Sequence, residues 1–211
     1  MKIRLLLVAL IAALMGMSYW ISSTESKPER IEVGKQALPP STKKLKNATM
    51  APGRVVELHT TKGEIDFVLF EKDCPKTAGR IAKLVQNGAY NGVKFPRVEN
   101  WLIQTDESKK SVQPMGCEIL EGLTHAKGTV GMARADNNYN SNTSIFYILL
   151  EPQPGLDMEY TNFGRLINGM DVALKIKKND SIISARVRPF TSLDKKRFNE
   201  VLRIEAERRV E

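Results

Sequence analysis

The chain has 211 residues, enough for one ordinary domain with extensions and a substantial core. Its formal net charge of +8 is spread thinly, about +2 over residues 1–21, +3 over 22–53, +2 over 54–188 and +1 over 189–211, whereas nucleic-acid binding needs a concentrated basic patch. We therefore expect no nucleic-acid partner, and the two isolated histidines, His59 and His125, with two isolated cysteines form no metal-ligand pattern.

Residues 1–21 predict a signal peptide or a signal anchor. Lys2 and Arg4 precede an apolar run, Leu5–Ile21, whose 17 residues lie at the short limit for crossing a bilayer about 30 Å thick. The only cleavage candidate, Gly16–Ser18, is weak, so we favour an uncleaved anchor in the inner membrane, with a cleaved signal as the alternative. Either reading places the rest of the chain on the periplasmic or extracytoplasmic side. Residues 22–53, rich in Ser, Thr, Pro, Lys and Glu, predict a flexible spacer.

Export would carry Cys74 and Cys117 into an oxidising compartment, where two thiols can pair. The sequence does not show that they lie close together. A disulfide therefore stays open beside the alternative, in which Cys74 is a small apolar residue at a helix entrance and Cys117 lies in a loop.

The next elements are mostly short strands. Residues 54–61 and 62–70 predict two strands joined by a tight turn at Lys62 and Gly63. A helix should follow from Pro75, which suits a first helical position, to Gly88, which suits a stop. Further strands are expected at 93–98, 101–105, 129–134, 145–150, 161–167 and 182–187, with a short helix at 170–176. Many short strands and few helices favour a mainly β, closed antiparallel sheet or barrel.

The last segment, residues 189–211, predicts an exposed C-terminal helix. Phe198, Val201 and Leu202 would supply its apolar contacts.

Three stretches carry a family resemblance. They are "VVELHTTKGEIDFVLFEKDCPKTAGRIAKLVQNGAYNGVKFPRV", "GTVGMARA" and "TSIFYILLEPQPGLDMEYTNFGRLINGMDVALKI", in this order and at nearly the spacing of the cyclophilins, which the chain resembles over residues 54–188. The resemblance implies a closed eight-stranded antiparallel β-barrel capped by two helices, peptidyl-prolyl cis-trans isomerase activity on proline-containing polypeptides, a monomer and no cofactor. It would make the chain an isomerase that assists the folding of exported proteins.

The chemistry explains which residues such an enzyme needs. Rotation about an X-Pro bond passes through a twisted state in which the prolyl nitrogen gains a lone pair, and a guanidinium aimed at that nitrogen would stabilise it. By resemblance, Arg97 is this guanidinium and Gln104 orients it or the peptide backbone. The substrate-binding residues implied in the same way are Trp101, Leu102, Ala135, Phe146, Tyr147, Leu156 and Tyr160. Each has a plainer alternative: Arg97 as a solvated strand residue, Trp101, Phe146 and Leu156 as core, and Gln104 as a partner for backbone groups.

Several positions depart from the family pattern. Pro96 stands in place of the usual histidine before the arginine, and the stretch between Val98 and Gln104 is one residue short. Other replacements are Arg134 for asparagine, Ile145 for glutamine, Tyr147 for phenylalanine, Gly155 for tryptophan or histidine, and Tyr160 for histidine. Polar groups that hold a peptide backbone are thus depleted, which predicts weak or narrow isomerase activity. Two alternatives stay open: a proline-peptide binding or chaperone module without turnover, and an adaptor that docks partners through its C-terminal helix.

Overall fold

The computed structural model describes residues 48–207. The predicted signal or anchor at 1–21 and residues 22–47 of the predicted spacer lie outside the described residues. Within 48–207, no helix combines the length and the apolar character needed to cross a bilayer.

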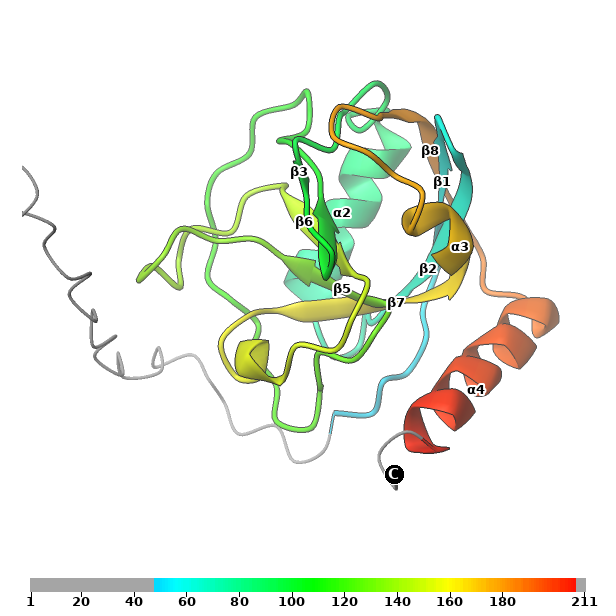
Figure 1. Ribbon diagram of the computed structural model, residues 1–211. Helices are drawn as coiled ribbons and strands as arrows, with labels where there is room; N and C mark the ends of the chain where they lie inside the picture. The colour runs from blue at the N-terminus through cyan, green and yellow to red at the C-terminus, as the bar shows by residue number, and fades with distance from the viewer. Residues whose placement is uncertain (1–47, 208–211) are drawn as a thin grey trace, which may run out of the picture. The chain divides into compact units, whose positions relative to one another are not determined.

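Eight antiparallel strands form one sheet in the order β3-β4-β6-β5-β7-β2-β1-β8 (Figure 1). Their bounds are β1 Val55–Thr60, β2 Gly63–Leu69, β3 Arg97–Val98, β4 Leu102–Gln104, β5 Thr129–Met132, β6 Phe146–Leu149, β7 Asn162–Asn168 and β8 Ile182–Arg188. The helices are α2 (Pro75–Gln86), α3 (Met170–Ala173) and α4 (Ser192–Glu207), with a 3₁₀ turn, η1, at Pro154–Leu156. The mainly β fold predicted from the sequence is confirmed.

The sheet closes on itself through irregular segments rather than through named strands. The end strands β3 and β8 are not paired in the ladder, but Gly92 donates its N–H to the Ile182 carbonyl (2.6 Å) and Ile182 donates to the Val93 carbonyl (2.8 Å). The strand predicted at 93–98 is therefore a single bridge at Lys94 followed by the two-residue β3. Pro96 explains the interruption, because it has no N–H to donate to a ladder.

The hairpin of β1 and β2 differs from the prediction by one residue. Thr60 pairs with Gly63, so Thr61 and Lys62 form the turn. Gly63 has φ +131°, a region that favours glycine, and a Cβ there would lie 3.1 Å from the Val172 side chain.

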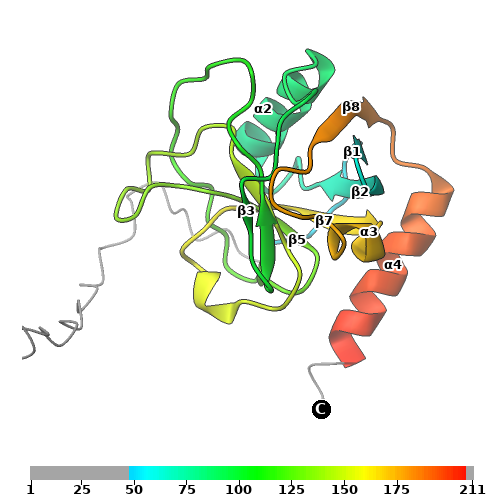
Figure 2. The ribbon, with the colours of Figure 1, turned by 45° about the horizontal axis from the view of Figure 1, so that its top comes forward.

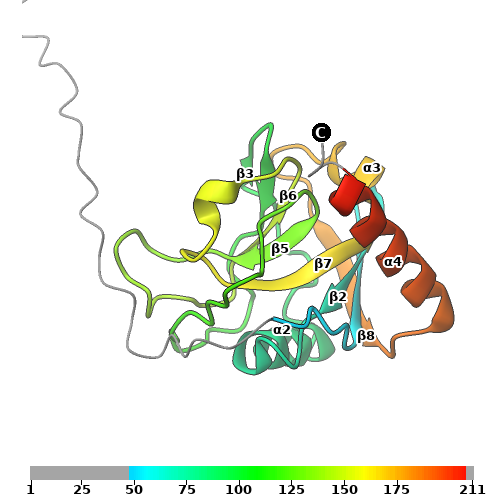
Figure 3. The same ribbon diagram turned by 90° about the horizontal axis from the view of Figure 1, so that it is seen from below.

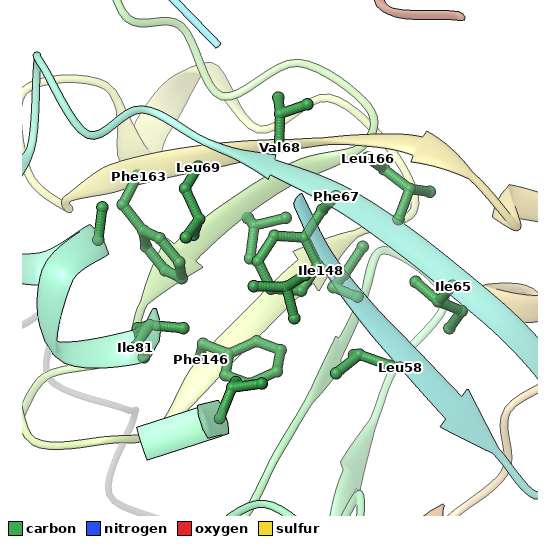
Figure 4. Packing of buried hydrophobic residues seen from close by; sticks show 14 of the residues in the cluster. Leu58, Ile65, Phe67, Val68, Leu69, Ile81, Phe146, Ile148, Phe163 and Leu166 are labelled. Atoms are coloured by element: carbon green, nitrogen blue, oxygen red, sulfur yellow. The ribbon is translucent and has the colours of Figure 1, made fainter. Parts of the chain in front are cut away.

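The core lies inside the curved sheet and is covered at one end by α2. Buried side chains of α2 recur on one helix face, as the sequence spacing predicts, and Ile81 points into the core. Figure 4 shows Ile81 near Phe146, with Phe67 and Phe163 from neighbouring strands; the Phe67 and Phe146 ring centroids are 5.9 Å apart. This packing fixes the strands whose outer faces carry the candidate site.

The C-terminal helix α4 runs along the outside of the barrel beside α3 (Figures 2 and 3). Phe198 is buried and packs edge-on against Phe70, with ring centroids 6.3 Å apart. Leu202 also packs against the core, and Val201 lines a cavity between α4 and the barrel.

Cys74 and Cys117 are free, so the disulfide alternative is not realised in this structure. The Cys74 thiol lies 3.3 Å from the Asn162 carbonyl, and the Cys117 thiol lies 3.5 Å from Asn142 Oδ1. Burial raises the pKa of both thiols, so both are held in the protonated, unreactive form.

Candidate functional site

The candidate site contains a row of four residues that are paired across four neighbouring strands. Arg97 on β3 pairs with Gln104 on β4, Gln104 pairs with Tyr147 on β6, and Tyr147 pairs with Gly131 on β5. Residues directly opposite in antiparallel strands project on the same face of a sheet. Because the alternating residues point into the core, this row lies on the outer face of the barrel.

The Arg97 guanidinium stands at the exposed end of the row. Its side chain is 46% exposed, its Cζ lies 5.3 Å from the centroid of the Trp101 ring, and its Nε lies 3.6 Å from Glu99 Oε1. An aromatic face and a carboxylate thus orient the cation while leaving it open to solvent. Within the described residues, no side-chain hydrogen bond joins Arg97 to Gln104, although the two are paired neighbours in the β3–β4 ladder.

An apolar cluster separate from the main core covers the same outer face. Leu102, Tyr147 and Leu149 form its buried part. The partly buried members packed against them are Trp101, Ala133, Leu156 and Tyr160. Five predicted substrate-binding residues, Trp101, Leu102, Tyr147, Leu156 and Tyr160, therefore come together beside Arg97. Leu149 and Ala133 were missed, although period-two alternation from Tyr147 points to Leu149.

Phe146 does not join this cluster, and the structure corrects its predicted place in the substrate pocket. It packs in the main core, with its ring centroid 5.4 Å from that of Tyr90. Successive strand residues point to opposite faces, so Phe146 points inward where its neighbour Tyr147 points outward. Ala135 also lies apart from the cluster: it is exposed in the loop after β5, where its N–H donates to Ser141 Oγ.

Tyr147 lies across Gly131 on the neighbouring strand. An ideal Cβ on Gly131 would come within 2.3 Å of Tyr147 Cζ and Oη, so the ring occupies the space that any side chain at position 131 would need. The ring also meets Tyr160 edge-on, with centroids 6.3 Å apart. Burial raises the pKa of Tyr147, and its hydroxyl has no hydrogen-bond partner among the described residues. The floor of the cluster is therefore apolar in character despite this hydroxyl.

Arg134 fixes the far wall of the cluster. Its Cζ lies between two rings, 4.4 Å from the Tyr139 centroid and 4.5 Å from the Tyr160 centroid, and its side chain is only 7% exposed. Arg134 Nη2 lies 3.3 Å from Glu159 Oε2, and the Tyr139 hydroxyl donates to the same oxygen at 2.5 Å. This arginine replaces a family asparagine, but its charge is used internally to hold the Tyr160 ring.

A buried histidine holds the loop that carries Leu156. The backbone N–H of His125 donates to Asp157 Oδ1 at 2.6 Å, and its ring Nδ1 lies 2.9 Å from the same oxygen. Burial lowers the pKa of His125 and outweighs the opposing effect of Asp157, so the ring is neutral at pH 7. Within residues 48–207, no three His, Cys, Asp or Glu side chains gather as metal ligands. His125 therefore serves to position the wall.

Comparison with known proteins gives one consistent result. The family model described as "Cyclophilin type peptidyl-prolyl cis-trans isomerase/CLD" matches residues 55–195. Peptidyl-prolyl cis-trans isomerase 10 of Caenorhabditis elegans is 35% identical over 132 residues, which cover 58% of this chain and 81% of that protein. A probable peptidyl-prolyl cis-trans isomerase of Brucella suis is 33% identical over 154 residues, covering 65% of this chain and 78% of that protein.

Solved structures show the same fold. A cyclophilin-type peptidyl-prolyl cis-trans isomerase of Cryptosporidium parvum matches with a TM-score of 0.59 at 23% identity, covering 64% of this chain and 98% of its own. A second crystal structure of that protein, determined in the presence of the dipeptide Ala-Pro, matches with a TM-score of 0.58 at 25% identity and the same coverage.

Proposed function

This chain belongs to the cyclophilin-type peptidyl-prolyl cis-trans isomerases, and on that premise we propose that its outer-face row and apolar cluster isomerise X-Pro bonds in exported polypeptides.

The proposed chemistry requires no covalent intermediate. The barrier to rotation, about 20 kcal/mol, comes from the partial double bond between carbon and nitrogen. The apolar cluster would hold the proline ring, and Arg97 would donate to the prolyl nitrogen as it becomes pyramidal. Because that lone pair exists only in the twisted state, the interaction lowers the barrier instead of merely tightening binding. Gln104, next to Arg97 on β4, would contact the peptide backbone.

One observation carries this assignment: the exposed guanidinium of Arg97 stands 5.3 Å from Trp101, which itself packs on the apolar cluster. A proline ring resting on the cluster would thus lie beside a cation. The Ala-Pro dipeptide in the related crystal structure supports a proline-containing substrate.

An isomerase assay on an Ala-Pro tetrapeptide tests the assignment. We expect the domain to catalyse cis-to-trans conversion, and Arg97→Ala to lower kcat/KM at least about tenfold, because one transition-state donor is lost. Lys94→Ala, which removes an exposed cation from the preceding segment, is the matched control and should act like the wild type. Equal rates for the wild type and Arg97→Ala would refute the role of Arg97.

The exported clients are proposed from the sequence. The basic residues and apolar run of 1–21 support export with an uncleaved anchor in the inner membrane, so the isomerase would assist folding of extracytoplasmic proteins. Cell fractionation of the full chain should place it in the membrane fraction, with residues 54–188 open to protease from the outer side of that membrane. Recovery of the protein in the cytoplasm would contradict the proposed export but not the proposed isomerase activity.

A second candidate, binding of proline segments with little turnover, is favoured by Arg134. The family asparagine at this position is replaced by a side chain that is buried between two tyrosines and engaged with Glu159. The Arg134 guanidinium therefore packs within the wall of the apolar cluster, and little of its surface is open to contact a peptide. Saturable peptide binding without faster X-Pro exchange would select this candidate.

A further inference from the structure

The C-terminal helix places a carboxylate beside a buried arginine of the barrel. Arg165 on β7 is fully buried, with 0% of its side chain exposed, and its Nη1 lies 3.5 Å from Glu205 Oε2 on α4. The Glu205 side chain is itself only 13% exposed. A buried guanidinium without a nearby carboxylate would be costly, so this pair ties α4 to β7 electrostatically.

The same two residues hold one loop from two sides. Arg165 Nη1 donates to the Lys127 carbonyl at 3.2 Å and Nη2 to the Thr124 carbonyl at 3.5 Å. The Thr124 hydroxyl donates to Glu205 Oε1 at 3.3 Å. Residues 124–127 are therefore fixed by hydrogen bonds to β7 and to α4 together.

This loop carries His125, and through it the helix reaches the candidate site. His125 binds Asp157 through its backbone N–H and its ring, and its carbonyl accepts the Gln153 N–H at 2.8 Å. Gln153 and Asp157 flank η1, whose last residue, Leu156, packs on the apolar cluster. A continuous series of polar contacts thus leads from Glu205 to the wall of the pocket.

The helix α4 does not pack closely against all of these loop segments. A cavity of about 670 Å³ separates α4 from the 124–128 and 152–157 segments, and its apolar lining includes Pro152, Pro154, Met170, Val201 and Ile204. Because no side chain of residues 48–207 fills this space, the contacts between these parts of the helix and the loop that the structure describes are polar.

We propose that Glu205 is a positioning residue for the prolyl pocket, acting through Arg165, the 124–127 loop and Asp157 on Leu156. The helix α4 then belongs to the substrate-binding apparatus and is more than a docking tail. This proposal rests on the proposed function for its kinetic consequence, but its structural consequence can be measured without any activity.

The test compares Glu205→Ala with Glu207→Ala in the full chain. Glu207 lies on the same helix, is exposed and pairs with Arg203, so its removal changes helix charge without touching the loop. In Glu205→Ala we expect KM for the Ala-Pro tetrapeptide to rise about fivefold with kcat changed less than about twofold, the size of a positioning effect. Glu207→Ala should match the wild type.

Amide hydrogen exchange gives the independent readout. The amides of His125 and Gln153 should exchange about tenfold faster in Glu205→Ala, the range expected for lost coupling, while those of α2 stay as in the wild type. If Glu205→Ala does not fold, Glu205→Gln, which removes the charge and keeps the shape, should show a smaller change at the same two amides.

Unchanged exchange at His125 and Gln153 overturns the proposal, whether or not the wild type is an isomerase. Equally faster exchange throughout the domain also overturns it, because that result marks a general loss of stability. An inactive wild type would refute the proposed function alone, and the exchange result would still decide the role of Glu205.

Discussion

Gly131 and Tyr147 show how a side chain on one strand restricts the residue type at the paired position of the next strand. The Tyr147 ring lies where a Cβ on Gly131 would be, 2.3 Å from two ring atoms. Nothing at this site requires glycine for its backbone conformation, since Gly131 is not among the positive-φ glycines. The glycine is needed to make room for the aromatic residue that forms the floor of the cluster.

Gly131→Ala should therefore destabilise the protein. We expect a loss of about 1–3 kcal/mol in the free energy of unfolding, the usual cost of overpacking, measured by urea denaturation. Gly79→Ala is the control: a Cβ at Gly79 in α2 meets nothing within 4 Å, and alanine there should raise stability by about 0.5–1 kcal/mol. A Gly131→Ala variant as stable as the wild type, with the Tyr147 ring unmoved, would contradict this reading.

At the residue scale, the sequence predicts the site in outline but not the direction of every side chain. Resemblance alone treats Phe146 and Tyr147 as equal partners, whereas strand alternation sends the first inward and the second outward. The fixing of Tyr160 by Arg134 could not be foreseen, because the contact depends on a loop that returns 26 residues later along the chain. The spacing of residues within a strand predicts which face of the sheet each side chain occupies. Contacts between loops can be identified only once the fold is known.

At the scale of an element, the start of helix α4 is held by side-chain contacts. Thr191 and Asp194 form a reciprocal cap: the Thr191 N–H donates to Asp194 Oδ2 at 2.8 Å, and the Asp194 N–H donates to Thr191 Oγ1 at 3.3 Å. Arg188 Nη2 donates to Asp194 Oδ1 at 2.9 Å, and this guanidinium holds the pKa of Asp194 well below its usual range. The start of the helix is thus fixed both to itself and to the end of β8.

Thr191→Ala should loosen that start. We expect a loss of about 1 kcal/mol in the free energy of unfolding, the usual value for a lost N-cap, together with faster amide exchange in the first turn of α4. Ser192→Ala, one residue on and exposed, should leave both quantities near those of the wild type. If the two variants behave alike, the cap contributes nothing measurable.

The short elements around Pro96 mark where prediction from pattern fails. Val93 and Phe95 are buried on either side of the exposed Lys94, as in a strand, yet Pro96 lacks the N–H that a ladder requires, and only Arg97–Val98 pairs with β4. Most other strands lie close to their predicted positions, since alternation and turn residues are local signals. Closure of the barrel depends instead on contacts between residues 92–95 and 179–182, far apart in the sequence.

At the scale of the whole molecule, we propose that the barrel's outer face is a catalyst and not only a binding surface. The architecture places Arg97 at the edge of an apolar cluster, the chain belongs to an isomerase family, and α4 reaches the same cluster through Glu205 and the 124–127 loop. These features predict a rate effect that a binding module lacks. Catalysis and binding must therefore be measured on the same sample.

The most direct measurement is NMR exchange between the cis and trans forms of an Ala-Pro peptide at saturating protein, for the wild type and Arg97→Ala. With the peptide fully bound, any difference reports the rotation step alone. We predict exchange faster with the wild type than in the free peptide and, with Arg97→Ala, exchange slower than with the wild type by at least about tenfold at nearly unchanged peptide affinity, because the lost donor acts in the twisted state. Equal exchange rates in the two complexes would contradict the assignment of catalysis to Arg97.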